Sequence, residues 1–301
     1  METEDLQGGV DCRQGLRFVL KKDETEGKMA ERHKLTMAQI MFLIAILIYL
    51  VNIVGILFTV ILNSASKGWY SGLLPKHLTL EWYRYVASDH DIPNLLYVTF
   101  IVALFVVVIS LVISFPAAYA MARHDFRFKG ILMSLFILPM IVPPMAYGIP
   151  LAVVLYKFGF AGRISGVIIA NIVPIVPFMI LVLQPFIEQI GVNLESAAKM
   201  LGAGRIRTFF KILVPLTMPG ILTASILSIV KTISMFELTY LVAGGKSQTI
   251  VVALYADAYA AGARPPQAVD ALAVIYFMTT MLCLVVALKF VSPTQMVFKL
   301  K

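Results

Sequence analysis

The sequence of 301 residues is poor in charge: Asp, Glu, Lys and Arg make up 14% of it, against about a quarter in an ordinary soluble domain. Hydrophobic residues make up 59%, and the mean hydropathy is +0.87. A soluble domain of this length cannot bury so much apolar surface, and a disordered chain contains far less of it. These figures exclude both classes and indicate a polytopic membrane protein.

Several chemical signatures are also missing. Cys12 and Cys283 are the only cysteines, so neither a disulfide framework nor a cysteine metal site is expected. The chain contains no G-x-x-x-x-G-K-[ST] phosphate loop and no set of residues placed for catalysis, so we expect neither an enzyme nor a bound cofactor. Residues 1–34 are polar and lack the apolar core of a cleavable signal peptide, so none is expected.

Six long apolar runs are present, each of the length that crosses about 30 Å of hydrocarbon. They predict an all-α fold with six spans, at about 38–62, 94–121, 131–156, 165–187, 214–243 and 270–291. Prolines in the third and fourth runs predict kinks. The expected domains are a tail at 1–37, a transmembrane domain at 38–292 with a polar loop at 188–213, and a tail at 293–301.

The net charge of +8 is explained by topology. If the N-terminus is cytoplasmic, 17 of the 25 basic residues fall on the cytoplasmic side and 7 on the outside. This bias favours an orientation with both termini inside the cell. The basic charge therefore gives no reason to expect a nucleic-acid partner.

The polar loop at 188–213 predicts a short helix over about 194–202. Asn193 can cap the N-terminus of this helix, and Glu195 in the first turn is favoured by the helix dipole. Gly202 is expected to end the helix.

The surface of this helix is unusually flat, because Ala197 and Ala198 have small side chains. Such a surface can enter a groove on another protein. The alternative interpretation is a helix that lies on the lipid headgroups, and the composition favours neither one.

The loop also carries a spaced motif, with Ser196-Ala197-Ala198, three residues, Gly202, nine residues, and then Ile212-Leu213-Val214-Pro215. The motif resembles the signature of the permease subunits of binding-protein-dependent ABC importers: Glu-Ala-Ala, three residues, Gly, nine residues, Ile-x-Leu-Pro. Ser196 replaces the signature Glu, with Glu195 one position earlier, and Val214 replaces Leu. Which side chain makes the contact of the signature Glu stays open.

A second stretch supports this resemblance. The sequence Ser-Phe-Pro-Ala-Ala-Tyr-Ala-Met-Ala-Arg at 114–123 is similar to the end of the second helix of the family. The resemblance covers about residues 38–292 and looks closest to the polyamine-type branch.

The resemblance implies a coupling helix that docks into a separate ATP-binding subunit. The implied partners are two such subunits with their ATP and Mg²⁺, a second permease (homologous but different), a solute-binding protein on the outer face, and the lipid of a bacterial inner membrane. The implied coupling residues are Glu195, Ser196, Ala197, Ala198, Leu201 and Gly202.

Polar residues inside the expected spans are candidates for the solute pathway, because charge in a membrane is costly. They are Asn171, Ser228, Thr232, Lys231 and Glu237. The alternatives are snorkelling of the two charges to water, close helix packing at the small hydroxyl residues, and a local side-chain bond of Asn171 to the backbone.

Two functional hypotheses follow. The leading one is an ABC importer permease that forms half of a pathway for a polyamine or related amino compound. The alternative is a self-contained secondary transporter in which Lys231 and Glu237 relay ions or protons. A membrane-embedded enzyme is the weakest interpretation, since no catalytic set is visible.

Overall fold

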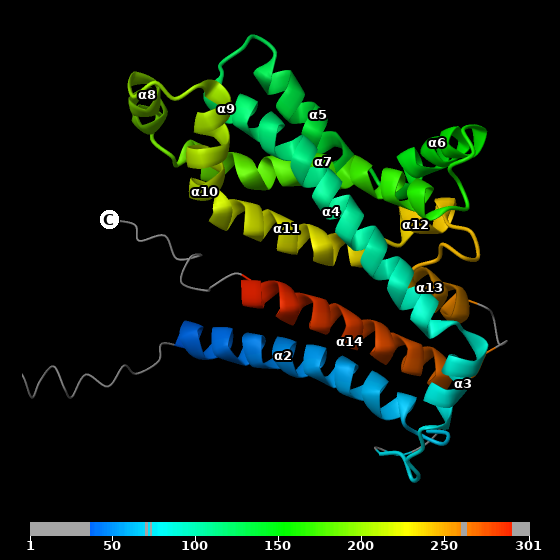
Figure 1. Ribbon diagram of the computed structural model, residues 1–301. Coiled ribbons are helices and arrows are strands. Elements are labelled where there is room, and N and C mark those ends of the chain that lie inside the picture. The colour runs from blue at the N-terminus through cyan, green and yellow to red at the C-terminus, as the bar shows by residue number, and fades with distance from the viewer. Residues whose placement is uncertain (1–36, 70–71, 73, 260–263, 291–301) are drawn as a thin grey trace, which may run out of the picture. The chain divides into compact units, whose positions relative to one another are not determined.

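The computed structural model describes residues 37–69, 72, 74–259 and 264–290 (Figure 1). The chain divides into two units, residues 1–58 and residues 59–301. The first unit contributes most of helix α2, Met37–Ser64, and the second unit contains the other described helices. Within the described residues, β-pairing is limited to one isolated bridge between Ser66 and Leu78. The expected helical class is confirmed for this part of the chain.

Four helices are long and apolar enough to cross a membrane: α2, α4 (Ile92–Arg123), α7 (Ile164–Glu188) and α14 (Pro266–Phe290). Two further candidates are bent pairs. Helices α5 (Lys129–Ile141) and α6 (Pro144–Lys157) meet at 96°, and the segments Arg205–Leu216 and Met218–Ile233 meet at 69°. The described residues thus give four spans, or up to six if each bent pair is one span.

The prolines of the third and fourth runs have different effects. Val142 and Pro143 separate α5 from α6, and Pro144 takes the first position of α6, where its missing N–H costs nothing. Helix α7 instead runs through three internal prolines without a break. Proline is tolerated inside membrane helices where neighbouring groups satisfy the freed backbone carbonyls. The Ser114 hydroxyl of α4 also donates to the Val176 carbonyl of α7 at 2.9 Å, which ties the two helices together.

The expected fifth span at 214–243 differs from the observed elements. Helical structure begins earlier, with α9 (Arg205–Thr208), the π-helical η1 (Phe209–Leu213) and α10 (Val214–Leu216). Helix α11 (Met218–Ile233) then ends before the expected boundary, and a separate helix, α12 (Glu237–Val242), follows. The prediction of a continuous helix was wrong at residues 234–236. This break contains no proline or glycine, so no local sequence signal marks it.

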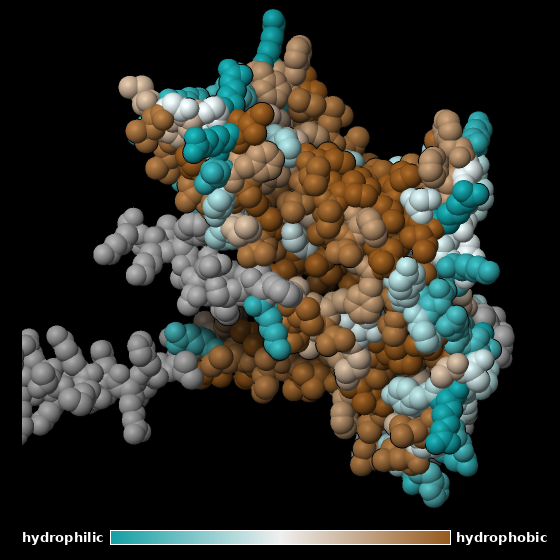
Figure 2. All heavy atoms as spheres, in the orientation of Figure 1, coloured by the Kyte–Doolittle hydropathy of each residue, from teal (hydrophilic) through white to brown (hydrophobic). Residues whose placement is uncertain are grey.

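Three short helices lie between the long ones: α3 (Glu81–Asp89), α8 (Val192–Met200) and α13 (Ile250–Tyr259). Helix α13 lies in the region between the fifth and sixth expected spans. It has ten residues, mostly apolar, which is too short to register as a span. Figure 2 shows that hydrophilic residues gather around α8 and around α12 and α13, while hydrophobic residues cover most of the visible helix sides.

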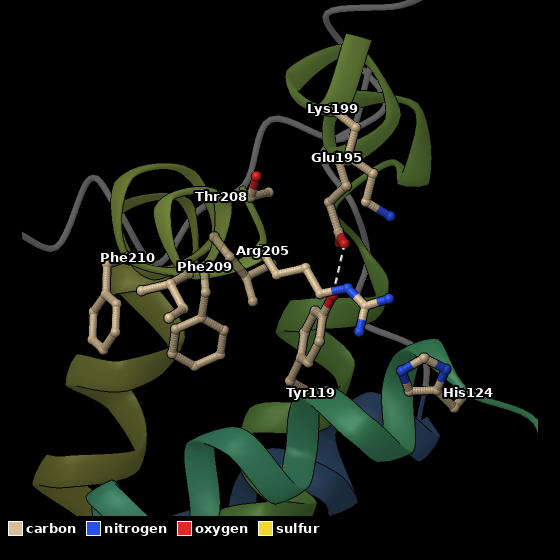
Figure 3. Close-up of a pocket in the computed structure, with 10 residues that line it drawn as sticks. Tyr119, His124, Glu195, Lys199, Arg205, Thr208, Phe209 and Phe210 are labelled. Carbon is tan, nitrogen blue, oxygen red and sulfur yellow. Dashed lines mark hydrogen bonds between the residues drawn. The ribbon is translucent and has the colours of Figure 1, made fainter. Parts of the chain in front are cut away.

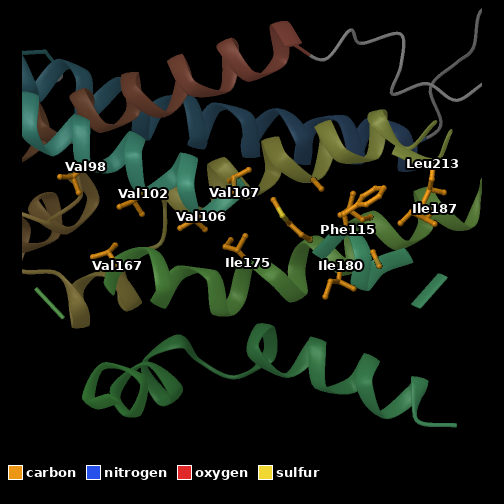
Figure 4. Close-up of a cluster of buried hydrophobic side chains, with 14 residues drawn as sticks. Val98, Val102, Val106, Val107, Phe115, Val167, Ile175, Ile180, Ile187 and Leu213 are labelled. Atoms are coloured by element: carbon orange, nitrogen blue, oxygen red, sulfur yellow. The ribbon is translucent and has the colours of Figure 1, made fainter. Parts of the chain in front are cut away.

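The main core lies where α4, α7 and α11 pack together (Figure 4). Its side chains are mostly β-branched or aliphatic, and include Val98, Val106, Val167, Ile175, Ile180 and Leu213. Helix α11 approaches α7 closely at Gly220: a Cβ atom added there would lie 2.5 Å from Cγ of Phe186. Glycine at this position permits the close approach of the two helices.

A polar cluster ties the end of α3 to the end of α13. The buried carboxylate of Asp257 lies 2.7 Å from Nε2 of His90 and 2.8 Å from Nε of Arg264. Arg264 also pairs with Asp89. These contacts hold Arg264, which lies just before α14, against the end of α3 and against α13.

Candidate functional site

Helix α8 is the short helix that the sequence predicted at 194–202, and it spans Val192–Met200. Its N-cap is Gly191 rather than Asn193, and no side chain caps it. The prediction of Asn193 as the cap was wrong, because the chain already turns helical at Val192. Gly202 follows the helix with a left-handed φ of 79°, a conformation that side chains with a Cβ atom rarely adopt.

A buried ion pair anchors α8 to the end of α4. Nε of Arg123 lies 2.7 Å from Oε1 of Glu195, and the two side chains are 7% and 8% exposed. The Tyr119 hydroxyl donates to Oε2 of Glu195 at 2.8 Å. Nη2 of Arg123 donates to the carbonyl of Ile190 at 2.7 Å. Both carboxylate oxygens of Glu195 are therefore satisfied inside this chain.

The six expected coupling residues divide between two sides of α8. Glu195 and Ala198 are buried, whereas the remaining members are exposed. Leu201 and its neighbour Met200 are each 89% exposed, which is unusual for large apolar side chains. The Ser196 hydroxyl turns back to the Val192 carbonyl at 3.3 Å. Helix α8 thus has one anchored side and one open apolar side.

An aromatic cluster connects this anchor to the segment that leads into α11. The Phe209 ring, the first residue of η1, lies edge-on to Tyr119 at 5.8 Å and to Phe115 at 5.3 Å between ring centroids. Such edge-to-face pairs add about 0.5–1.5 kcal/mol each. The sequence reading missed Arg123 and Phe209 here, since it counted Arg123 only among the basic loop residues.

The two charged candidates in the membrane region do not meet. Lys231 lies near the end of α11, and its Nζ stands 4.6 Å from the centre of the Phe178 ring. Glu237 begins α12, after the break at 234–236. Both side chains are half-buried, and neither has an ion-pair partner within the described residues.

The other three candidates are buried polar groups. Nδ2 of Asn171 donates to the Val167 carbonyl at 2.9 Å and to Oγ1 of Thr239 at 3.1 Å, so the local backbone bond considered for Asn171 is present. Its Oδ1 and the hydroxyls of Ser228 and Thr232 have no hydrogen-bond partner in the described part of the chain. These three side chains of α7 and α11 are buried within the chain, where polar atoms without a partner are rare.

The fold and the anchored helix define a class. Helices of membrane-crossing length carry buried polar groups, and a short helix fixed beside them offers an open apolar side. Among the residues that the structure describes, no three His, Cys, Asp or Glu side chains gather as metal ligands do. This arrangement is that of a multi-pass membrane component of a transport system.

Comparison with known families identifies the family of transport components. Residues 113–296 match the family model of the binding-protein-dependent transport system inner membrane component. Because the match covers more than half of the chain, the protein belongs to this family. The resemblance to ABC importer permeases is confirmed at that level, and the protein is a transport subunit.

Curated relatives include the molybdenum transport system permease protein ModB of Azotobacter vinelandii, 30% identical over 56% of this chain and 81% of that protein. The sulfoquinovosyl glycerol transport system permease protein SmoH of Agrobacterium fabrum is 33% identical, over 54% of this chain and 58% of SmoH. The chain therefore spans only a little over half of the length of SmoH.

Solved structures show the same fold. A chain from a bacterial ABC transporter involved in the import of alginate superposes with a TM-score of 0.69 at 19% identity, covering 85% of this chain and 99% of that one. A chain of the methionine ABC transporter MetNI in an inward-facing form gives a TM-score of 0.51 at 17% identity, over 69% and 94%.

Proposed function

We propose that the protein is the membrane-spanning permease subunit of an ATP-driven importer in a bacterial inner membrane. Helix α8 couples it to a separate ATPase, which carries the ATP and Mg²⁺. The observation that carries this proposal is the division of α8 into a side anchored by Glu195 and an open side with Met200 and Leu201. A helix held on one side and bare on the other is suited to docking in a groove of another protein.

The proposed assembly contains two ATP-binding subunits, a second permease that is homologous but different, and a solute-binding protein at the outer face. Both termini lie in the cytoplasm, as the distribution of basic residues favours. Family membership and the names of the relatives as permease proteins support these partners.

The proposed pathway runs beside the polar residues of α7, α11 and α12. Its candidate members are Asn171, Ser228, Thr232, Lys231 and Glu237. The orphaned polar atoms of the first three support the assignment. Transporters place their substrate sites near the bilayer midplane, and polar residues inside membrane spans are candidates for such sites.

For the solute we propose a small amino compound of the polyamine type. The Lys231 ammonium already lies over the Phe178 ring, so Glu237 is the charge with the greater need of a partner. A carboxylate at that position favours a cation. The relatives named above transport other solutes, molybdenum and sulfoquinovosyl glycerol, so the support for an amine comes from Glu237 alone.

The coupling proposal is tested with Leu201→Asp in the complex reconstituted with its ATPase, second permease and binding protein. We expect solute-stimulated ATPase activity to be lost, because a carboxylate on the open side of α8 cannot enter an apolar groove. Phe158→Asp is the matched control, since Phe158 is 74% exposed at the end of α6. Unchanged stimulation in Leu201→Asp, or equal loss in the control, would contradict the proposal.

The secondary-transporter alternative predicts uptake by this chain alone in liposomes. Lys231 and Glu237 lie on separate helices without a bridging group among the described side chains, which gives a relay no support. Uptake that needs ATP and the partner subunits is the outcome that we expect.

A further inference from the structure

A pocket lies beside α8, on the side of the helix that carries Glu195 and Lys199. It lies between the end of α4, α8, α9 and η1, and has a volume of about 460 Å³ (Figure 3). We propose that this pocket binds the phosphate group of an anionic membrane lipid.

The charge of the pocket is positive. Lys199 of α8, Arg205 of α9 and His124 after α4 all line it. Neither Lys199 nor Arg205 has a hydrogen-bond or ion-pair partner within the described residues. The one acidic lining residue, Glu195, is already neutralised by Arg123. Two basic side chains are therefore left for an anion, and guanidinium groups suit phosphate oxygens especially well.

A buried hydroxyl provides an independent observation. Thr208 lines the pocket, is 5% exposed, and has an Oγ1 atom without a hydrogen-bond partner in the described part of the chain. A helical threonine commonly donates to the carbonyl four residues earlier, but Thr208 makes no such bond. Buried hydroxyls are rarely left unsatisfied, so a bound oxygen atom of a ligand explains this one.

The walls of the pocket favour a lipid over a soluble phosphate. Phe209 and Leu213 line it, and Phe210 and Ile206 at its rim are 64% and 77% exposed. A free phosphate ion gains nothing from these apolar side chains, whereas a lipid brings acyl chains that cover them. The pocket also lies where α4 ends, and basic pockets at the ends of membrane helices are typical sites for anionic headgroups.

The same position argues against an acidic side chain of a partner protein as the ligand. The open side of α8, with Leu201, is where we expect the ATPase, while the pocket lies on the anchored side with Glu195. A lipid there links α8 to α9 through Lys199 and Arg205. Anionic lipid is therefore expected to stabilise this part of the protein.

The test uses the full-length chain purified in detergent, with bound lipid measured by native mass spectrometry and unfolding followed by heating. Phosphatidylglycerol, phosphatidylcholine and inorganic phosphate are the three probes. We expect phosphatidylglycerol to bind saturably and to raise the unfolding midpoint, and the other two probes to do neither.

Arg205→Gln and Thr208→Val are expected to weaken phosphatidylglycerol binding by about tenfold, which equals about 1.4 kcal/mol. Arg127→Gln is the control, because Arg127 is exposed and lies outside the pocket. If either pocket variant fails to fold, Lys199→Gln at an exposed position replaces it. Equal binding of phosphatidylglycerol and phosphatidylcholine, equal loss in the control, or binding of inorganic phosphate alone would overturn the proposal.

Discussion

The polar groups at the end of α4 and those of α11 and α12 differ in whether their hydrogen bonds and charges are satisfied within the chain. At the first place, Arg123, Tyr119 and Glu195 pair completely. At the second, Ser228 and Thr232 are buried with unsatisfied hydroxyls, and Glu237 has no ion-pair partner among the described residues. One chain thus contains a closed polar network and an open one.

The difference distinguishes polar groups that stabilise the fold from polar groups that are candidates for a role in transport. A closed buried ion pair fixes a geometry, and removing one partner leaves an uncompensated charge. Open polar groups in a membrane region are costly, so they mark places where a ligand or another subunit completes the bonds. Mutations at the two places should accordingly affect different measurements.

The largest effect is expected for Arg123→Met, which leaves Glu195 charged and buried. We expect a loss of about 3–5 kcal/mol in the free energy of unfolding, measured by denaturant titration in mixed micelles. The double variant Arg123→Met/Glu195→Leu should recover most of the loss, because it removes both charges. A double variant no more stable than Arg123→Met would show that the network is not closed.

The next effect is on transport. Glu237→Gln should lower solute uptake in the reconstituted complex by about tenfold, or about 1.4 kcal/mol, without lowering the unfolding midpoint. The carboxylate has no ion partner in the described chain to lose. Glu81→Gln, at an exposed residue of α3, is the control and should leave uptake unchanged. Loss of stability without loss of uptake would show that Glu237 stabilises the fold, as the closed network at the end of α4 does.

A smaller effect is expected for Asn171→Leu. The side chain donates one hydrogen bond within α7, to the Val167 carbonyl, and one to Thr239 of α12. Hydrogen bonds between membrane helices average about 0.6 kcal/mol with a maximum of about 1.7. We expect unfolding to become easier by about that amount while uptake falls further than this figure explains. If uptake falls only as far as the loss in the free energy of unfolding explains, Asn171 has only a structural role.

The smallest effect is expected for Ser196→Glu, which restores the family signature residue. Ser196 is exposed and its hydroxyl makes one long bond, so stability should change by no more than about 0.5 kcal/mol. Solute-stimulated ATPase activity reports whether the partner uses a carboxylate there. A large loss of stability would mean that this side of α8 is covered within the chain.

Sequence reasoning succeeded where the pattern is local. The long apolar runs predicted α4, α7 and α14 within a few residues, and Gly202 marked the end of α8. It failed where the cause is distant in the chain: the partner of Glu195 lies 72 residues away. The break before Glu237 has no helix-breaking residue, so only packing decides it.

The contact of Gly220 with Phe186 has a consequence for evolution. The two residues divide a single volume between α11 and α7, with glycine contributing only backbone and phenylalanine filling the space. A lineage that gains a side chain at position 220 must lose one of similar size at position 186. We therefore expect these two positions to covary among relatives, with their summed volume nearly constant while either residue alone changes.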